Sequence, residues 1–488
     1  MNKFSVTPRR GFLRQSGRTV STAGLTAANL LRSTSASPPS SGFLAGAAQR
    51  DVTPPVGMEI LHFYRNNIGA HDPLFVRALV IADTTGKSVA LITGDFLGAG
   101  FVCCDEIRTR VRDKAGVDEV WFSASHTHAG RWLVSTPTAG RPYTDELEWD
   151  ELTEKGPITE RPQELQWNNE VHQAIDEIVG EAQRKLVPVD LRAGRAAVQV
   201  GFNRRLAAAD GSIYMGVNRD GPVVPWVNVL SAHAQDTGRP VAIYFEHAAH
   251  PVTVPHGSNL VSADFPGAAV KRIRTHLGEE VIALFGQGCS GNINSFPLRS
   301  THADADLAGG QLGDAVLQAM QQSEVLKSNK LKLKTVVTEL PTRSLPPLEL
   351  VEELLRDNPE DARRRKQLAK IKTILLRGGT PPARRFEVHG VMIGDEWCLV
   401  GLNYELFAQI ELWVAKAAPF RWTMVNSLTN GGRAYLGDDE ALALGPKGGY
   451  EAGCLPNWSG HETMSPSLGP PAVGCETLVK KTIAKLWS

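Results

Sequence analysis

Two histidines, His126 and His128, follow a short apolar run at residues 120–124. Their side chains can bind a metal ion or transfer a proton, and they are two positions apart. Residues two apart on an extended chain point to the same side. Two imidazoles on one face suit a metal ligand beside a proton-transfer group. Histidines that cap an element or lie on the surface are the alternative explanation of this motif.

Three further polar clusters also follow apolar runs. The second contains His247 and His250, and either could bind a metal, with a hydrogen-bonded structural histidine as the alternative. In the third, Glu405 interrupts an apolar run. Because burying a carboxylate without a partner is costly, we expect a cation beside it. The fourth combines residues 430–435 with residues 448–451. Two histidines and a glutamate with an open position are the usual ligands of a catalytic zinc site.

Loop residues that a rigid sheet supports often carry out chemistry, so the elements around these clusters matter. Strands and helices alternate along the chain, which predicts an α/β fold in one large domain, with central mixed β-sheets flanked by helices. The pattern does not assign the strand order. Strands are expected at residues 78–82 and 89–93 (a hairpin), 120–124, 241–245, 282–285, 331–339 and 387–402. Helices are expected at residues 170–186, 268–277 and 305–320, with a solvated helical insertion at 347–377.

The composition excludes several classes of protein. Of 488 residues, 42% are hydrophobic and 21% are charged, which excludes a disordered chain, a collagen and a coiled coil. The 52 basic and 52 acidic residues balance, so we expect no nucleic-acid partner. No apolar run approaches the roughly 18 residues of a membrane-spanning helix. We therefore expect a soluble or peripheral protein.

The N-terminus has the pattern of an export signal. Arg9 and Arg10 precede Phe-Leu, a weakly apolar segment and a Pro/Ser-rich linker. This order is typical of a bacterial twin-arginine signal, and a disordered basic tail is the alternative. We assign residues 1–43 to the signal and linker, expect export to the periplasm or the outside of the cell, and assign residues 44–488 to the functional domain.

The six cysteines show no CxxC spacing, so neither a zinc ribbon nor a redox pair is indicated. Most are expected to be buried free thiols. Cys454 and Cys475 are the nearest plausible disulfide pair.

Several motifs, in this order, resemble the N-terminal catalytic domain of the neutral/alkaline non-lysosomal ceramidases. The resemblance covers residues 44 to about 475, and no single motif in it is unique. The motifs that carry it are AGAAQRDVTPP at residues 45–55, HDPL at 71–74, SHTH at 125–128, Asn203-Arg204, His250, SADFPG at 262–267, Glu405, Tyr435 and GYE at 449–451.

The resemblance implies one zinc ion per chain. In that family two histidines, a glutamate and a tyrosine hold the zinc, which places the ligands here at His126, His250, Glu405 and Tyr435. His128 would be an acid/base or substrate-orienting group, and Arg204 and Tyr450 would face the substrate amide. Asn294 and Gly57 would bind substrate.

The implied function is that of an exported zinc-dependent amidohydrolase. It would cleave the N-acyl bond of ceramide or a related lipid amide with a zinc-bound water, whose pKa the metal lowers to about 7. His128, Arg204 and Tyr450 could stabilise the oxyanion and protonate the departing amine. Peripheral membrane contact and the oligomeric state are left open.

Two departures from the family pattern bear on the substrate. Asn294 stands where the family loop carries a serine, and an amide can hydrogen-bond a substrate but cannot act as a nucleophile. The glycine-rich residues 286–291 before it could approach a substrate or form a structural turn. We also expect no C-terminal immunoglobulin-like domain, which the family's well-known enzymes carry. The alternatives are a same-fold metallohydrolase that acts on another amide or ester, derived from a glycan or peptide, and a non-catalytic metal-containing binding protein.

Overall fold

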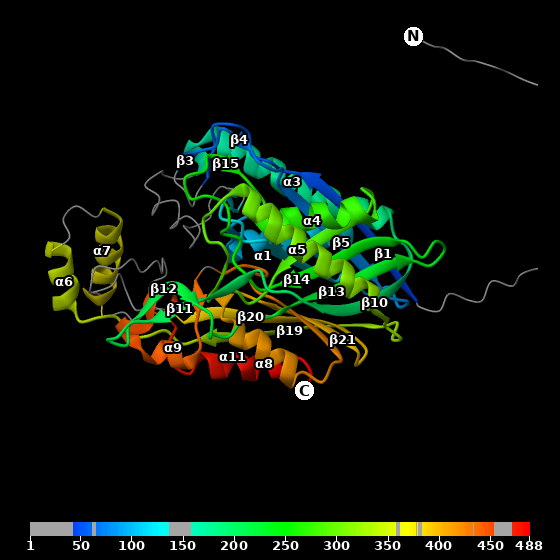
Figure 1. The fold of residues 1–488 in the computed structure, drawn as a ribbon. Coiled ribbons are helices and arrows are strands. Elements are labelled where there is room, and N and C mark those ends of the chain that lie inside the picture. The colour runs from blue at the N-terminus through cyan, green and yellow to red at the C-terminus, as the bar shows by residue number, and fades with distance from the viewer. Residues whose placement is uncertain are drawn as a thin grey trace, which may run out of the picture. The chain divides into compact units, whose positions relative to one another are not determined.

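Two β-sheets packed face to face form the centre of the molecule, with helices on the outside (Figure 1). The predicted α/β class with mixed sheets flanked by helices is therefore confirmed. Residues 39–488 cluster into one compact unit. The computed structural model describes residues 42–60, 65–135, 158–357, 362–376, 378, 383–432, 434–452 and 471–488. Residues 1–41 of the expected export signal, and Cys454, lie outside these ranges.

The larger sheet contains the predicted hairpin and most of the buried strands. Its strand order is β16-β14-β13-β10-β1-β5-β6-β8, and β18 also pairs with β10. The hairpin is the antiparallel β5–β6 pair, whereas β6–β8 and β14–β16 are parallel. Its strands are β1 (Phe43–Asp51), β5 (Phe75–Ala82), β6 (Ser88–Gly94), β8 (Glu119–Ala124), β10 (Val187–Ala197), β13 (Trp226–Ala234), β14 (Pro240–His247), β16 (Ile282–Gln287) and β18 (Glu324–Val325).

This sheet curls on itself. The edge strand β16 contacts β5, β6 and β8, although β8 is the other edge in the strand order. The accumulated twist of neighbouring strands produces such curvature. As a result, the loops that follow β8 and β14 come together, and the first two polar clusters of the sequence lie on these loops.

The smaller sheet packs on the inner face of the larger one. Its order is β19-β20-β21-β23, and the last pair is parallel. Trp121 and Leu91 of the larger sheet share one buried cluster with Trp397, Leu399 and Met424 of the smaller sheet. Burying one face of each sheet in this way removes a large apolar area from water. Its strands are β19 (Leu331–Leu340), β20 (Arg384–Ile393), β21 (Trp397–Leu402) and β23 (Trp422–Asn426).

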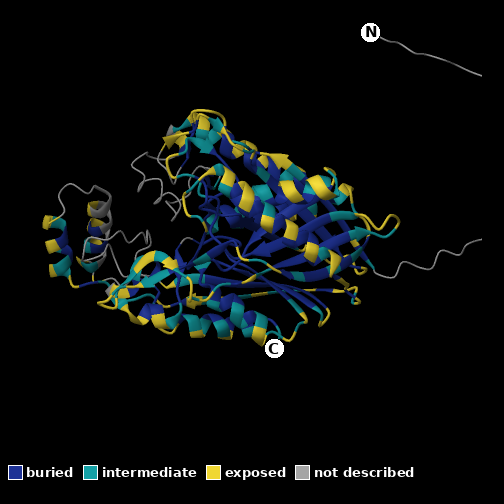
Figure 2. Ribbon diagram, viewed as in Figure 1, coloured by how far each residue is buried: buried dark blue, intermediate teal, exposed yellow. Residues whose placement is uncertain are grey.

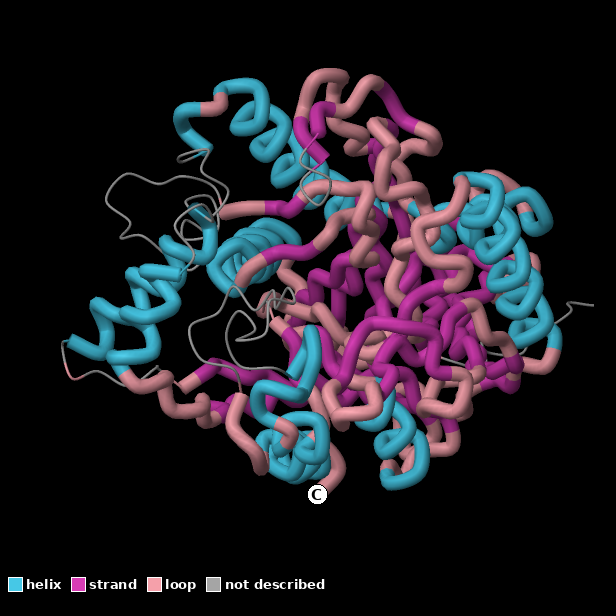
Figure 3. The backbone as a smooth tube through the Cα atoms, turned by 60° about the vertical axis from the view of Figure 1, so that its left-hand side comes forward, coloured by secondary structure: helices cyan, strands magenta, loops and turns pink. Residues whose placement is uncertain are grey.

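Helices cover the outer faces of both sheets (Figures 1 and 3). In Figure 2 the strands are mostly buried and the exposed residues lie on the helices and loops around them. The larger sheet is covered by α1 (Phe101–Ala115), α3 (Pro162–Arg184), α4 (Asp264–Leu277) and α5 (His302–Gln321). The smaller sheet packs against α8 (Ala408–Ala417) and α11 (Cys475–Ala484).

The short elements connect these layers. The expected helical insertion contains α6 (Leu348–Asp357) and α7 (Ala362–Leu376), which pack on each other through a small apolar cluster of their own. The other helices are α9 (Asp439–Ala443) and α10 (Gly449–Ala452), with 3-10 turns η1 (Ile158–Glu160) and η2 (Gly445–Gly448). The short strands are β2 (Glu59–Ile60), β3 (Arg65–Asn66), β4 (Gly69–Ala70), β7 (Gly98–Ala99), β9 (Trp132–Leu133), β11 (Gly201–Ala207), β12 (Ile213–Asn218), β15 (Leu260–Val261), β17 (Ile293–Ser295), β22 (Glu405–Leu406) and β24 (Tyr435–Leu436).

Local signals explain where the main helices begin and end. The side chain of Thr301 accepts a hydrogen bond from the Asp304 backbone N–H and caps the start of α5. Gly116 ends α1 in the left-handed conformation, with φ 64°. In the described part of the chain no helix has the length and hydropathy to cross a membrane.

The described cysteines are all buried and free, as expected for most of them. Cys475 forms no disulfide, and its thiol donates to the carbonyl oxygen of Pro341 at 3.3 Å. The partner considered for it, Cys454, lies outside the described residues.

Two buried carboxyl groups, Glu246 on β14 and Glu411 on α8, lie together in the core. Glu246 accepts from the side chain of Asn228 at 2.8 Å, and Glu411 accepts from the backbone N–H of Cys289 at 2.9 Å. Burial raises the pKa of Glu246 to about 7, and burial together with the Glu246 charge raises the pKa of Glu411. Two adjacent buried carboxylates cannot both ionise easily, so the pair holds a proton at neutral pH, beside the positive charge of Arg195.

This pair makes a contribution to stability that is lost as the pH rises. The unfolded glutamate has an ordinary pKa of 4.5 and the folded Glu246 a pKa of about 7, so between these values the folded state binds more protons. Glu411→Gln removes one charge and is expected to reduce the loss of unfolding free energy between pH 5 and pH 8 by on the order of 2 kcal/mol. Urea unfolding at both pH values measures this difference. The control is the exposed Glu280→Gln, and a pH dependence as steep in Glu411→Gln as in the native protein would contradict the prediction.

Candidate metal centre

Three imidazoles from two loops lie together. His126 and His128 follow β8, His250 follows β14, and their nearest nitrogen atoms all lie within 4.8 Å of one another. The ring centroid of His126 is 4.9 Å from that of His128 and 4.8 Å from that of His250. His126 and His250 are buried, and His128 is half-buried. The curled sheet has thus joined the first two polar clusters of the sequence.

Backbone carbonyls set the orientation of two of these rings. The Nδ1 atom of His126 is 2.6 Å from the carbonyl oxygen of Leu97, and Nδ1 of His250 is 2.7 Å from that of Ser290. A carbonyl oxygen only accepts, so each ring donates its Nδ1–H, and Nε2 is left with a lone pair when the ring is neutral. Outer hydrogen bonds of this kind orient histidines that bind metals.

The carboxylate of Glu405 meets both Nε2 atoms. Its Oε2 lies 3.2 Å from Nε2 of His126 and 2.9 Å from Nε2 of His250. Burial would raise the pKa of Glu405, but the two imidazoles lower it well below its ordinary value. Burial and the nearby Arg204 charge lower the pKa of His250 to about 4, so its ring is neutral at pH 7. Nitrogen and carboxylate donors that converge at these distances are the usual donor set of a zinc-type site, so the residues fit a metal ion.

Tyr435 lies at the same point. Its hydroxyl oxygen is 3.5 Å from Nε2 of His250. The short parallel pair β22–β24 places Glu405 directly opposite Tyr435. Burial raises the pKa of the Tyr435 phenol well above its ordinary value, so the hydroxyl is protonated when no cation is bound. The four candidate ligands that the family resemblance implied therefore lie together, and His128 is a fifth side chain beside them.

Three residues of the centre, or next to it, have strained backbones. His126 has φ 66°, Tyr404 before Glu405 has φ 66°, and Ala434 before Tyr435 has φ 137°. L-residues adopt such angles at a cost of about 1–3 kcal/mol each, and they persist only where the surrounding structure enforces them. The strained residues are thus the candidate ligand His126 and the residues directly before the candidate ligands Glu405 and Tyr435.

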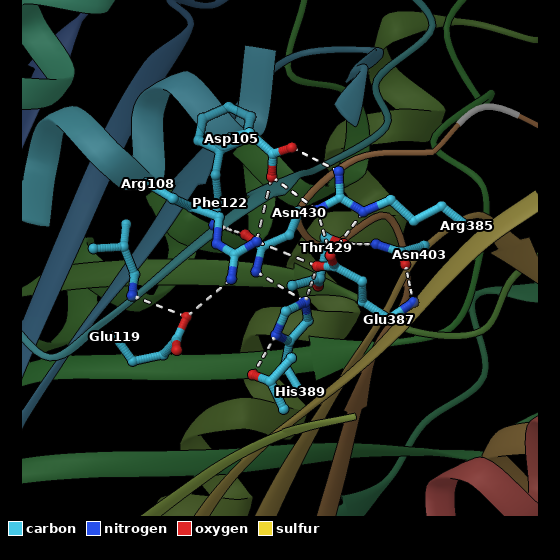
Figure 4. Close-up of polar contacts among 12 residues, drawn as sticks. Asp105, Arg108, Glu119, Phe122, Arg385, Glu387, His389, Asn403, Thr429 and Asn430 are labelled. Carbon is cyan, nitrogen blue, oxygen red and sulfur yellow. Dashed lines mark hydrogen bonds and ion pairs between the residues drawn. The ribbon is translucent and has the colours of Figure 1, made fainter. Parts of the chain in front are cut away.

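A buried polar network holds these segments in place (Figure 4). Asn430, with φ 57°, accepts from the backbone N–H of Phe122 at 2.9 Å, and its amide nitrogen lies 3.2 Å from Nε2 of His389. His389 in turn lies 2.9 Å from Glu387, which is ion-paired with Arg108 at 3.2 Å. The network therefore ties the loop that leads to Tyr435 to the strand β8 that leads to His126.

Arg204 organises the opposite side of the centre. Its guanidinium donates to Oε1 of Glu451 at 2.7 Å, to Oδ1 of Asn294 at 2.9 Å and to the carbonyl oxygen of Gly291 at 2.7 Å. Its central carbon lies 5.2 Å from the ring centre of Tyr435 and 5.4 Å from that of Tyr450. Burial opposes the charge, but Tyr435 and Glu451 raise the pKa of Arg204 above its ordinary value, so it is charged.

Most of the site residues expected from the sequence lie in this one region, and Gly57 is the exception. Gly57 occupies a turn with φ 94° and donates its N–H to the carbonyl oxygen of Asn67 at 2.9 Å. No contact in the described ranges joins Gly57 to the others. The residues that come together are His126, His128, Arg204, His250, Asn294, Glu405, Tyr435 and Tyr450.

The sequence analysis included Glu451 in a motif but gave it no role. In the structure Glu451 pairs with both Arg204 and Arg205, at 2.7 and 2.6 Å. The carbonyls of Leu97 and Ser290 left no signal, because any residue type supplies a carbonyl.

Comparisons with known proteins identify the fold. No protein-family model and no curated protein matches the chain. Among solved structures, a ceramidase complexed with C2 matches with a TM-score of 0.63 and 16% identity, over 91% of this chain and 75% of that one. The neutral ceramidase from Pseudomonas aeruginosa matches with a TM-score of 0.62 and 15% identity, over 91% and 74%. The chain therefore has a neutral ceramidase-like fold.

Removal of one ligand tests the centre. His250→Ala is expected to weaken the binding of added zinc by more than about 100-fold, because the centre loses one nitrogen donor that the fold holds in position. Metal analysis after dialysis, with a competition titration, measures this loss. Glu405→Gln should have a similar effect and His128→Ala a smaller one. The control is His302→Ala, which changes a histidine outside the cluster, and unchanged zinc content in His250→Ala would refute the assignment.

The network in Figure 4 predicts a stability effect. Asn430→Ala leaves the buried N–H of Phe122 without its acceptor and places alanine at a positive φ, so the unfolding free energy should fall by about 2–4 kcal/mol. Asn430→Gly tolerates the positive φ and should lose about 1 kcal/mol less. Urea unfolding of both variants measures the two contributions. If both variants unfold as the native protein does, the network does not hold this loop.

Proposed function

We propose that this protein is a zinc-dependent hydrolase that cleaves the N-acyl amide bond of ceramide or a related lipid amide. One observation carries the proposal: the Glu405 carboxylate lies within 3.2 Å of two Nε2 atoms, on rings whose Nδ1–H groups bond to backbone carbonyls. The ceramidase-like fold supports it, although a fold alone does not determine a substrate.

His126, His250, Glu405 and Tyr435 would hold the metal. This donor set of nitrogen and oxygen suits zinc and would also accept other first-row ions. When bound, zinc acts as a Lewis acid and makes water a nucleophile at neutral pH. The remaining steps depend on side chains of the chain itself.

Tyr450 is the group we assign to the substrate carbonyl, and Arg204 supports it. Three of the five N–H groups of Arg204 are used by Glu451, Asn294 and Gly291, so this residue acts chiefly by positioning the two tyrosines. The Tyr450 hydroxyl would donate to the carbonyl oxygen as negative charge develops there. His128, half-buried at the edge of the cluster, would give a proton to the departing amine.

Asn294 favours a second candidate, a same-fold metallohydrolase that acts on another amide or ester. Its side-chain oxygen already accepts from Arg204 at 2.9 Å, so it shapes the site rather than presenting a hydroxyl as the family serine does. We also propose export, which rests on the twin-arginine pattern at Arg9 and Arg10.

The test is an assay of zinc-loaded protein for fatty-acid release from a short-chain ceramide. Tyr450→Phe is expected to lower kcat by about 10²–10³-fold at unchanged zinc content, the usual effect of losing one oxyanion donor. The control is Tyr214→Phe on β12, which is half exposed.

Three results would decide between the functions. Release that Tyr450→Phe reduces supports the lipid amidase. Zinc-loaded protein that spares ceramide but cleaves other amides or esters establishes the second candidate. Bound zinc without hydrolysis of any substrate in the panel indicates a binding protein.

A further inference from the structure

Glu451 is a buried carboxylate that two neighbouring arginines share. Its side chain is 2% exposed, its Oε1 lies 2.7 Å from Nε of Arg204, and its Oε2 lies 2.6 Å from Nη1 of Arg205. Both carboxylate oxygens therefore accept from a charged donor, which makes each hydrogen bond stronger than one between neutral groups. Buried ion pairs are often no more stabilising than apolar packing, so stability alone does not account for this cluster.

An irregularity in the strand brings the two arginines to the same carboxylate. Arg204 and Arg205 are consecutive residues of β11, and in a regular strand their side chains would point to opposite faces of the sheet. The pairing of β11 with β12 shifts its register between Asn203 and Arg205, and the side chain of Asn203 accepts from the backbone N–H of Arg205 at 3.0 Å. β-Bulges re-aim side chains in this way, which explains how both guanidinium groups reach Glu451.

Arg204 connects Glu451 to the metal centre. The central carbon of its guanidinium lies 5.2 Å from the ring centre of Tyr435 and 5.4 Å from that of Tyr450, and the two rings lie 5.3 Å apart. Glu451 holds this guanidinium at its Nε–H group. Because a guanidinium is planar and rigid, fixing one edge sets the position of the whole group against both tyrosines.

Arg205 and Glu451 together hold the helix α10. This helix has only four residues, Gly449–Ala452, which are too few to be stable through their own hydrogen bonds. Arg205 donates to the carbonyl oxygen of Gly448, directly before the helix, at 2.8 Å and to Glu451 within it at 2.6 Å. The ion pairs therefore fasten the helix that carries Tyr450 to the strand β11.

We propose that Glu451 is a positioning residue for the candidate metal centre. Its carboxylate fixes Arg204 and the helix α10, and through them it holds Tyr435 and Tyr450 in the arrangement that the centre requires. This inference rests on the proposed function, in which Tyr435 holds the metal and Tyr450 faces the substrate carbonyl. A carboxylate that only stabilises the fold is the competing role, and the experiment separates the two.

Cobalt(II) tests the positioning role without any substrate. It binds to sites of nitrogen and oxygen donors, and its visible absorption depends on the number and geometry of the ligands. Glu451→Gln keeps the size of the side chain and removes its charge. This variant is expected to change the visible spectrum of the cobalt-loaded protein and to weaken cobalt binding by about 10-fold, the usual effect of losing an outer partner of a ligand. Glu451→Asp keeps the charge and should restore part of the native spectrum.

Hydrolysis measures the same effect through Tyr450. Glu451→Gln should lower kcat by about 10–100-fold and change KM by less than about 3-fold, because the loss falls on a group that acts in the transition state. Since Glu451 acts through Arg204, Glu451→Gln combined with Arg204→Gln should be no slower than Arg204→Gln alone, to within about 2-fold. Independent roles would instead multiply the two losses.

Asp176 on α3 is the matched control, because two basic side chains also share its carboxylate. Its oxygens lie 2.8 Å from Arg110 and 2.8 Å from Lys114, between the helices α1 and α3. Asp176→Asn should lower the free energy of unfolding, as Glu451→Gln should, and leave the cobalt spectrum and kcat as in the native protein. Urea unfolding and far-ultraviolet circular dichroism establish that each variant is folded.

The outcomes separate this inference from the proposed function. A native cobalt spectrum and kcat in Glu451→Gln, losses that multiply in the double variant, or an equal spectral change in Asp176→Asn would overturn the positioning role. Native protein that binds cobalt but hydrolyses no substrate, with a spectrum that Glu451→Gln alters, would support the positioning role and contradict the proposed reaction. Native protein that binds no cobalt would overturn both.

Discussion

The structure around the site depends on one buried carboxylate. Glu405 lies between two imidazoles whose Nδ1–H groups already donate to backbone carbonyls, so both rings direct Nε2 at the same carboxylate oxygen. A cation at this point satisfies all three groups at once. The curled sheet, the short pair β22–β24 and the carbonyls of Leu97 and Ser290 each contribute to this arrangement.

The strained residues around Glu405 have the same origin. Tyr404 and Ala434 have positive φ angles next to two candidate ligands. Asn430 also has a positive φ angle, in the loop that precedes Tyr435 and bonds to β8. Metal binding is coupled to folding in such sites, because the free energy of ligation offsets the cost of assembling the ligands. The buried network of Asn430, His389 and Glu387 offsets part of that cost without a metal.

The sequence predicted the local parts of the site better than their assembly. The β5–β6 hairpin, the strands before the histidine clusters and the position of Glu405 in an apolar run follow from alternation and from the cost of a buried charge. The curl of the larger sheet does not, since it depends on contacts between strands far apart in the chain. Gly57 was expected in the site from a resemblance, and its turn has no recorded contact with the site residues in the described ranges.

The origin of the candidate ligands along the chain has a consequence for when the centre can form. His126 and His250 come from the larger sheet, whereas Glu405 and Tyr435 come from segments that follow strands of the smaller sheet. A ribosome must therefore release nearly the whole chain before the fourth ligand exists. Loading of a metal at this centre would thus be a late event in the life of the molecule, and the compartment in which the finished chain folds would decide which ion it first meets.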